Sequence, residues 1–174
     1  MNRRGAVRTL LYIAGGTLVL PACFRQSGTA SIALQNLSVS EADERLLAEL
    51  VETLFPTTNT PGGKELLLHL FVLKMVDDCH GREDQQAFSS GLSAFSTWSQ
   101  DKLGGSFTHA APDEQAALVE AIQTQEDGVI TKFYAIFKRR AIQGYMNSQY
   151  VMTNLIKYEL VPGRYNGYFP VEKD

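Results

Sequence analysis

The segment from Lys64 to Asp78 constrains the fold of this chain most, because it is apolar on nearly every side. Its length and composition predict a helix. Most of its residues are large and apolar: Leu66, Leu67, Leu68, Leu70, Phe71, Val72, Leu73, Met75 and Val76. A helix without a polar face has to be surrounded by protein. We therefore expect it to be the central helix of a bundle; a face covered by another subunit is the alternative, and both can hold.

Helical periodicity marks four further segments. A helix is predicted to begin at Ser40, whose hydroxyl suits an N-cap, and to end at Pro56. A helix from about Asp84 to Lys102 ends at Gly104-Gly105, the next begins near Pro112, and the last ends near Gly144. Their apolar stripes are Leu46, Leu47, Leu50, Val51 and Leu54, then Phe88, Leu92, Phe95 and Ser99, then Ile130, Phe133, Tyr134 and Phe137. Since no sustained period-two alternation occurs, the fold class is all-α, a compact helical bundle of about five helices.

The C-terminal region, residues 144–170, differs in composition and predicts an irregular, aromatic-rich tail. It places six aromatic residues among Gly, Pro and Asn: Tyr145, Tyr150, Tyr158, Tyr165, Tyr168 and Phe169. Tyrosine offers a large contact area with a polar tip, which suits a surface buried against another protein. The tail either contacts a partner or wraps back over its own bundle.

The N-terminus reads as an export signal. Arg3 and Arg4 precede an apolar run from Thr9 to Leu20, which is too short to span a bilayer and has the length of a signal-peptide core. Leu20-Pro21-Ala22-Cys23 then matches a bacterial lipoprotein cleavage site, so residues 1–22 are expected to be removed and Cys23 to be lipidated. A plain secretory signal is the alternative. The adjacent arginines favour the twin-arginine route for folded cargo.

The rest of the chain is expected to form a tether and one domain. Residues 23–39 are mostly polar and predict a lipid-anchored tether, and residues 40–174 form one helical domain. We expect the mature protein on the periplasmic side of the cell envelope, attached to a membrane. The first 22 residues hold three of the 16 basic residues and none of the 19 acidic ones, which leaves a mature charge of about −6. Nucleic-acid binding is therefore not expected, because it needs a basic face.

The polar residues do not predict a catalytic, cofactor-binding or metal site. Asp77-Asp78-Cys79-His80 holds four metal-competent side chains, but successive helical residues point about 100° apart and cannot converge on one ion. His69 is expected to be a satisfied core histidine, and His109 to lie in a loop. If Cys23 is lipidated, Cys79 has no intramolecular partner; a buried thiol is expected, with pairing to a partner subunit as the alternative.

Several motifs of this chain resemble one family. They are Leu54-Phe55-Pro56, Thr60-Pro61-Gly62-Gly63-Lys64 before an apolar helix, Gly144-Tyr145, and Val161-Pro162-Gly163-Arg164-Tyr165-Asn166-Gly167. In this order and spacing they resemble the gluconate 2-dehydrogenase subunit 3 family, over roughly residues 40–170. Some relatives have a cysteine shortly after the last motif, where this chain has Tyr168. A disulfide from Cys79 to the tail is therefore not expected.

The resemblance implies a non-catalytic small subunit of a FAD-dependent sugar or polyol dehydrogenase. Such a subunit would aid the folding, export and membrane attachment of a flavoprotein subunit that holds the FAD, and a cytochrome c is a candidate electron acceptor. The candidate partner contacts are Tyr145, Pro162, Gly163, Arg164 and Tyr165. The alternative is a free-standing envelope lipoprotein that acts as a scaffold or interaction protein.

Overall fold

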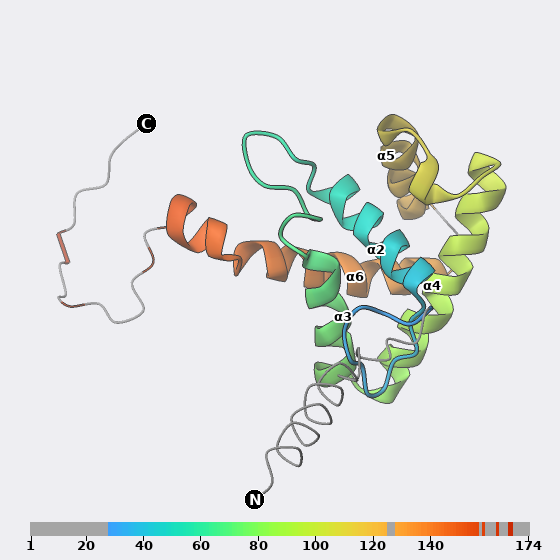
Figure 1. Cartoon of the computed structure of the whole chain (residues 1–174), viewed down its shortest axis with the longest axis horizontal. Helices are drawn as coiled ribbons and strands as arrows, with labels where there is room; N and C mark the ends of the chain where they lie inside the picture. Colours follow the sequence, from blue (N-terminus) through green and yellow to red (C-terminus); the bar gives the residue numbers. More distant parts are fainter. Residues whose placement is uncertain (1–27, 125–127, 157, 159–162, 164–166, 169–174) are drawn as a thin grey trace, which may run out of the picture.

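The protein is all-helical, as predicted. The computed structural model describes residues 28–124, 128–156, 158, 163, 167 and 168 (Figure 1). Its five longer helices are α2 (Glu41–Leu54), α3 (Leu68–Cys79), α4 (Arg82–Leu103), α5 (Pro112–Ala121) and α6 (Gly128–Met146). Two 3₁₀ turns, η1 (Phe107–His109) and η2 (Ile122–Thr124), and the π-helical turn η3 (Val151–Leu155) complete the order. In these residues no helix is both long and apolar enough to cross a membrane.

Local sequence signals set the helix ends. The Ser40 hydroxyl accepts a hydrogen bond from the Asp43 N–H at 3.1 Å, and the Asp43 carboxylate accepts one from the Ser40 N–H at 3.1 Å. This capping box starts α2. Pro112 is the first residue of α5, and Gly104 ends α4 with a φ of 65°, a left-handed conformation that glycine adopts without strain. These three predicted boundaries are confirmed.

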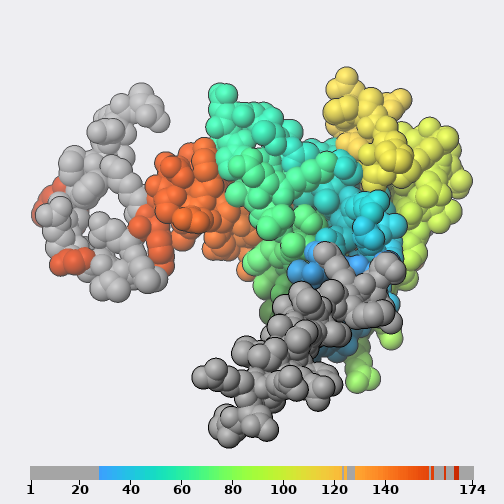
Figure 2. Space-filling view, in the orientation of Figure 1, coloured from blue at the N-terminus to red at the C-terminus, as the bar shows by residue number. Residues whose placement is uncertain are grey.

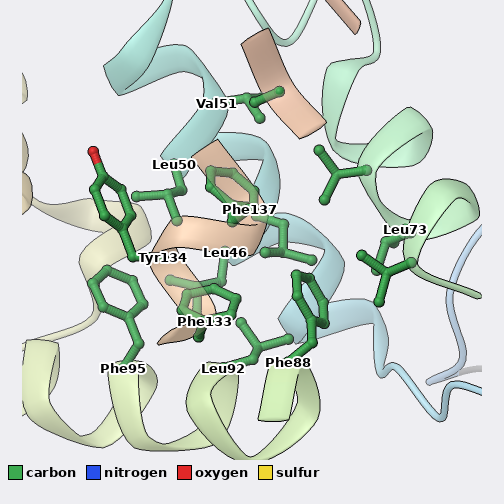
Figure 3. Close-up of a cluster of buried hydrophobic side chains, with 14 of the residues drawn as sticks. Leu46, Leu50, Val51, Leu73, Phe88, Leu92, Phe95, Phe133, Tyr134 and Phe137 are labelled. Atoms are coloured by element: carbon green, nitrogen blue, oxygen red, sulfur yellow. The ribbon is translucent and has the colours of Figure 1, made fainter. Parts of the chain in front are cut away.

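α6 runs through the middle of the bundle, against α4 along one side and α3 along another (Figure 1). The interior holds an aromatic cluster in which Phe133 of α6 lies 5.1 Å from Phe88 and 6.0 Å from Phe95, between ring centroids (Figure 3). Gly91 of α4 faces Phe133 so closely that a Cβ at residue 91 would overlap the Phe133 Cβ. The glycine therefore lets α4 and α6 pack together.

The helix predicted from Lys64 to Asp78 is shorter and less enclosed than expected. It begins at Leu68, because the preceding residues form turns and Leu67 has a left-handed φ of 52°. Leu68, Val72, Leu73 and Val76 are buried, but Leu67 is 55% exposed and Phe71 is half-buried. The prediction that this helix is the central one was wrong, since α6 takes that place and α3 keeps a partly open apolar side.

The N-terminal loop, residues 28–40, packs against the helices. It closes on itself through hydrogen bonds from the Ala30 N–H to the Val39 carbonyl at 3.0 Å and from the Glu41 N–H to the Gly28 carbonyl at 3.1 Å. Leu37 and Val39 are buried in the core. Residues 28–39 were expected to belong to a tether but are part of the folded domain. Residues 1–27, with the predicted signal, lie outside the described residues.

Candidate functional site

Three motifs meet at one place in the structure, although about 80 residues separate Gly144-Tyr145 from the other two. The Phe55 ring stacks on the Tyr145 ring, with centroids 4.8 Å apart and planes 11° from parallel. The Gly63 N–H donates to the Phe55 carbonyl at 2.8 Å. A Cβ on Gly144 would lie 2.7 Å from Cδ1 of Phe71, so this glycine allows α6 to approach α3. The end of α2, the start of α3 and the C-terminal half of α6 therefore form one packed unit.

Glu52 organises the loop between α2 and α3. Its carboxylate accepts hydrogen bonds from the N–H groups of Thr57 and Lys64, both at 3.0 Å, and from the Thr57 hydroxyl at 2.7 Å. Burial alone would raise the pKa of Glu52, but these donors outweigh it and lower the pKa below its ordinary value. A Cβ on Gly63 would lie 2.5 Å from the Val51 carbonyl oxygen. The Thr60–Lys64 motif therefore has a structural role, which is to hold this loop against α2.

Exposed apolar side chains concentrate toward the C-terminus. Eight large apolar side chains are exposed in the described residues; Leu67 and Val129 are two of them, and the other six come after residue 141. These six are Ile142, Met146, Leu155, Ile156, Tyr158 and Tyr168. We call Ile142, Met146, Leu155, Ile156 and Tyr158 the C-terminal apolar group. A concentration of exposed apolar residues marks an interaction site in a soluble domain.

The geometry of α6 explains why these residues are exposed. Its first half is enclosed by the bundle. Its C-terminal half packs on one side against α3 and the loop after α2, and its other side is open. The turn η3 extends beyond the body (Figures 1 and 2). Ala135, Arg139, Ile142 and Met146 are all exposed, and their spacing places them along one stripe of the helix. This stripe begins with a small residue and a guanidinium and ends with two large apolar side chains.

Residues 147–156, which directly follow α6, include one helical turn. The Ile156 N–H donates to the Val151 carbonyl at 2.9 Å, which closes the π-helical turn η3. Val151 is 2% exposed, whereas Leu155 is 58% and Tyr158 53% exposed. π-helical turns are rare and often lie at functional sites. The described part of the tail thus presents apolar side chains outward, as the partner-contact alternative requires.

The predicted partner contacts fall partly within the described chain. Tyr145 is half-buried in the stack with Phe55, and Gly163 is exposed. The remaining predicted residues lie outside the described residues: Arg3, Arg4, Cys23, Pro162, Arg164 and Tyr165. Sequence reasoning missed Ile142 and Met146. A signal was present for Ile142, because it is a large apolar residue on a helix whose buried stripe was already assigned to other positions. Met146 lies beyond the predicted end of that helix, and α6 extends to include it.

Asp77 is a structural carboxylate. It is 1% exposed and accepts hydrogen bonds from the N–H groups of Gln35 at 2.8 Å, Asn36 at 2.7 Å and Leu37 at 2.9 Å. Burial would raise the pKa of Asp77, but the three backbone donors, with Lys74 nearby, lower it below its ordinary value. Asp77 therefore holds the N-terminal loop on α3.

The three residues after Asp77 have separate surroundings. Asp78 pairs with Lys74 at 3.1 Å, and Cys79 is exposed, so the expectation of a buried thiol was wrong. His80 places Nδ1 3.0 Å from the Asp84 carboxylate, and its Nε2 accepts a hydrogen bond from Nε of Arg140 at 2.9 Å. Across the described ranges, no group of His, Cys, Asp and Glu residues is arranged to hold a metal ion.

The two other histidines do not assemble a catalytic pair in the described structure. His69 is only 7% exposed and its Nδ1 has no hydrogen-bond partner there, so it is a core histidine but not a satisfied one. Burial lowers the pKa of His69, Glu44 opposes this shift, and Lys64 adds to it. His109 ends η1, not an irregular loop, and lines a cleft of about 470 Å³ between α2, α4 and η1.

Comparison with known proteins gives one match. The family model described as Gluconate 2-dehydrogenase subunit 3 matches residues 41–163, which is well over half of the chain. The matched range includes the loop held by Glu52, the stack of Phe55 on Tyr145, and the whole C-terminal apolar group. Neither the curated proteins nor the solved structures that were compared contain a match.

Proposed function

Because the chain belongs to the gluconate 2-dehydrogenase subunit 3 family, we propose that it is the non-catalytic small subunit of a heteromeric FAD-dependent dehydrogenase. The large subunit holds the FAD and oxidises a sugar or polyol such as gluconate, and a cytochrome c is the candidate electron acceptor. The small subunit aids the folding and export of the large subunit and attaches it to a membrane. The family match supports a role in a dehydrogenase complex, and the C-terminal apolar group supports binding of the large subunit.

The observation that carries this proposal is the C-terminal apolar group. Large apolar side chains left in water cost free energy that docking recovers, at about 25 cal/mol per Å² of apolar surface buried. Two of the three other large exposed apolar residues, Leu67 and Val129, lie outside the C-terminal region, and single exposed apolar residues occur on any protein surface. The flavoprotein is proposed to bind along the stripe of α6 that contains Ile142 and Met146, and over η3.

The N-terminal sequence supports the export and attachment roles. In this proposal Arg3 and Arg4 direct folded cargo to the twin-arginine route, and Cys23 carries the lipid on the periplasmic side of the envelope. A flavoprotein that lacks a signal of its own would cross the membrane as a complex with this chain. A subunit that carries the signal for folded cargo needs no active site of its own.

The test is affinity purification of the tagged full-length protein from native membranes, followed by flavin absorbance and identification of the bound proteins. Two variants, Ile142→Glu and Met146→Glu, place a charge on the proposed surface, where the wild-type residues are 45% and 48% exposed. Val129→Glu is the matched control, because Val129 is 46% exposed near the other end of α6.

We expect a stoichiometric flavoprotein with the wild type and the control. Each surface variant should retain at least about fivefold less flavin, since an interface residue of this kind contributes over about 1 kcal/mol. A colourless, lipidated protein recovered alone would contradict the proposal and favour a free-standing envelope lipoprotein. Equal loss in all three variants would show that the docking surface lies elsewhere.

A further inference from the structure

The N-terminal loop fixes the position of the chain just after the proposed lipid anchor. The Asp77 carboxylate accepts hydrogen bonds from three backbone N–H groups of the loop, and the Glu41 N–H donates to the Gly28 carbonyl. The loop therefore cannot leave the domain without losing all of these bonds. The loop lies at the end of the body where α3 stops and α4 begins (Figure 1). Gly28 is therefore a fixed exit point on that end of the domain.

The distance from this exit point to the lipid is short. Five residue steps separate Gly28 from Cys23, and they span at most about 17 Å when fully extended. α4 alone has 22 residues and a length of about 33 Å. The reach of the anchor is thus about half the length of α4, which keeps the end with the N-terminal loop nearer to the bilayer than the end with α5.

A polar cleft opens at the same end of the domain. It has a volume of about 650 Å³, and no acidic residue lines it. Its lining is Gln35, Asn36, Arg82, Gln85, Gln86, Ser89 and Ser90. Among the described residues, no hydrogen bond or ion pair engages the side chains of Arg82, Gln86 and Gln35. A guanidinium and two amides with free donors suit phosphate oxygens, and arginine can bind a phosphate through two parallel hydrogen bonds.

The charges around the cleft leave Arg82 available. The nearby carboxylates already have partners: Asp78 pairs with Lys74, Glu83 with Lys132, and Asp84 with His80. Asp77 is occupied by the backbone of the N-terminal loop. The exposed guanidinium of Arg82 at the start of α4 is therefore not neutralised by the acids of its own surroundings.

We propose that this cleft binds the phosphate headgroups of the bilayer that holds the lipid anchor, and so orients the domain with the α3–α4 turn against the membrane. This inference rests on the proposed attachment through Cys23. It places α6 and η3 to one side of the anchored end, so the C-terminal apolar group stays accessible to the large subunit (Figure 1). The bound ligand is a phospholipid surface, not a free phosphate.

Cys79 provides the probe. It is exposed at the end of α3, on the proposed membrane face, and lipidation consumes the thiol of Cys23. The full-length lipidated protein is labelled there with a nitroxide and reconstituted into phosphatidylethanolamine–phosphatidylglycerol vesicles that contain a nickel-chelating headgroup. The comparison label sits on α5, in a Cys79→Ser variant that also carries Asp113→Cys.

We measure how much the nickel headgroups increase the spin-relaxation rate of each nitroxide. We expect this increase to be at least fivefold larger for the label at residue 79 than for the label at residue 113. Arg82→Gln should reduce the ratio of the two relaxation increases at least twofold. Lys102→Gln, the same charge change at the opposite end of α4, should leave this ratio unchanged. Soluble glycerol phosphate should not change the ratio either. Equal relaxation at both labels, equal effects of the two variants, or loss of the contrast with glycerol phosphate would each overturn the assignment to the bilayer.

Two readouts separate this inference from the proposed function. The mass of the purified protein shows whether Cys23 carries a lipid; an unmodified Cys23 would refute both the attachment and the orientation. Bound flavin in the same preparations reports on the large subunit. If flavoprotein is retained and Cys23 is lipidated while the two labels relax equally, the orientation alone is wrong.

Discussion

Replacing Asp77 by alanine should detach the N-terminal loop from α3 and strongly destabilise the domain. The carboxylate accepts three backbone hydrogen bonds of 2.7 to 2.9 Å. Bonds to a charged group contribute about 1.5–3 kcal/mol each, but they are not additive. The N–H of Leu37 is buried and would be left unsatisfied, whereas those of the exposed Gln35 and Asn36 can bind water. We therefore expect a loss of about 3–5 kcal/mol, a large share of the stability of a domain this size.

Asp78→Ala is the matched control, one residue further along α3. Asp78 is exposed and pairs with the exposed Lys74, so its removal should cost less than about 0.5 kcal/mol. The measurement is urea unfolding of the mature protein, followed by circular dichroism. Limited proteolysis should also cleave residues 28–39 much faster in Asp77→Ala than in the control. Equal free energies of unfolding for the two variants, with equal protection of the loop, would refute the anchoring role of Asp77.

The same residue gives a pH dependence with a definite sign. The pKa of Asp77 is lowered in the folded protein from an ordinary value of 3.8. The unfolded chain therefore takes up the proton more readily, and the stabilisation is complete above about pH 4 and is lost as the pH falls through the lowered pKa. The difference in stability between wild type and Asp77→Ala should be constant near neutrality and shrink in acid.

Two further predictions concern the core. His69→Leu should raise the free energy of unfolding by about 1 kcal/mol at pH 7, because it removes a buried, unpaired Nδ1. Since burial lowers the pKa of His69 from 6.5, the wild type should also lose stability between pH 7 and pH 5 faster than this variant, and parallel pH profiles would contradict the reasoning. Gly91→Ala should cost about 1–3 kcal/mol, since its Cβ would overlap Phe133 and lie 2.8 Å from the Val129 carbonyl oxygen. Gly105→Ala, with no atom within 4 Å, should change the thermal midpoint little, and a similar shift for both variants would rule out the steric explanation.

The helices were predictable because their signals are local. Ser40 starts α2, Gly104 ends α4 and Pro112 starts α5 through contacts or backbone preferences within a few residues of each boundary. The stripe of Phe88, Leu92 and Phe95 likewise indicates one buried helical face by its spacing alone. Fold class follows from such signals, which need no knowledge of the rest of the chain.

The N-terminal loop and the C-terminal apolar group depend on contacts that residue spacing does not reveal. Residues 28–39 read as a polar tether because the group that holds them, Asp77, comes about 40 residues later. Ile142 was not singled out because an apolar residue beside a buried stripe is usually assigned to the core. Only the packing of α6, which leaves one side of its C-terminal half uncovered, shows that Ile142 and Met146 are exposed.

Helix α6 belongs both to the core and to the proposed docking surface, so partner binding and the stability of this chain are linked. Its first half contributes Phe133 and Phe137 to the core, and its second half carries the proposed docking residues Ile142 and Met146. A partner that binds only the folded form stabilises it by mass action, by about 2.7 kcal/mol when present at 100 times its dissociation constant. Under the proposed function, a small subunit without its large subunit would therefore unfold more often and be degraded by proteases. Degradation of unassembled chains would then match the amounts of the two subunits without coordinated synthesis.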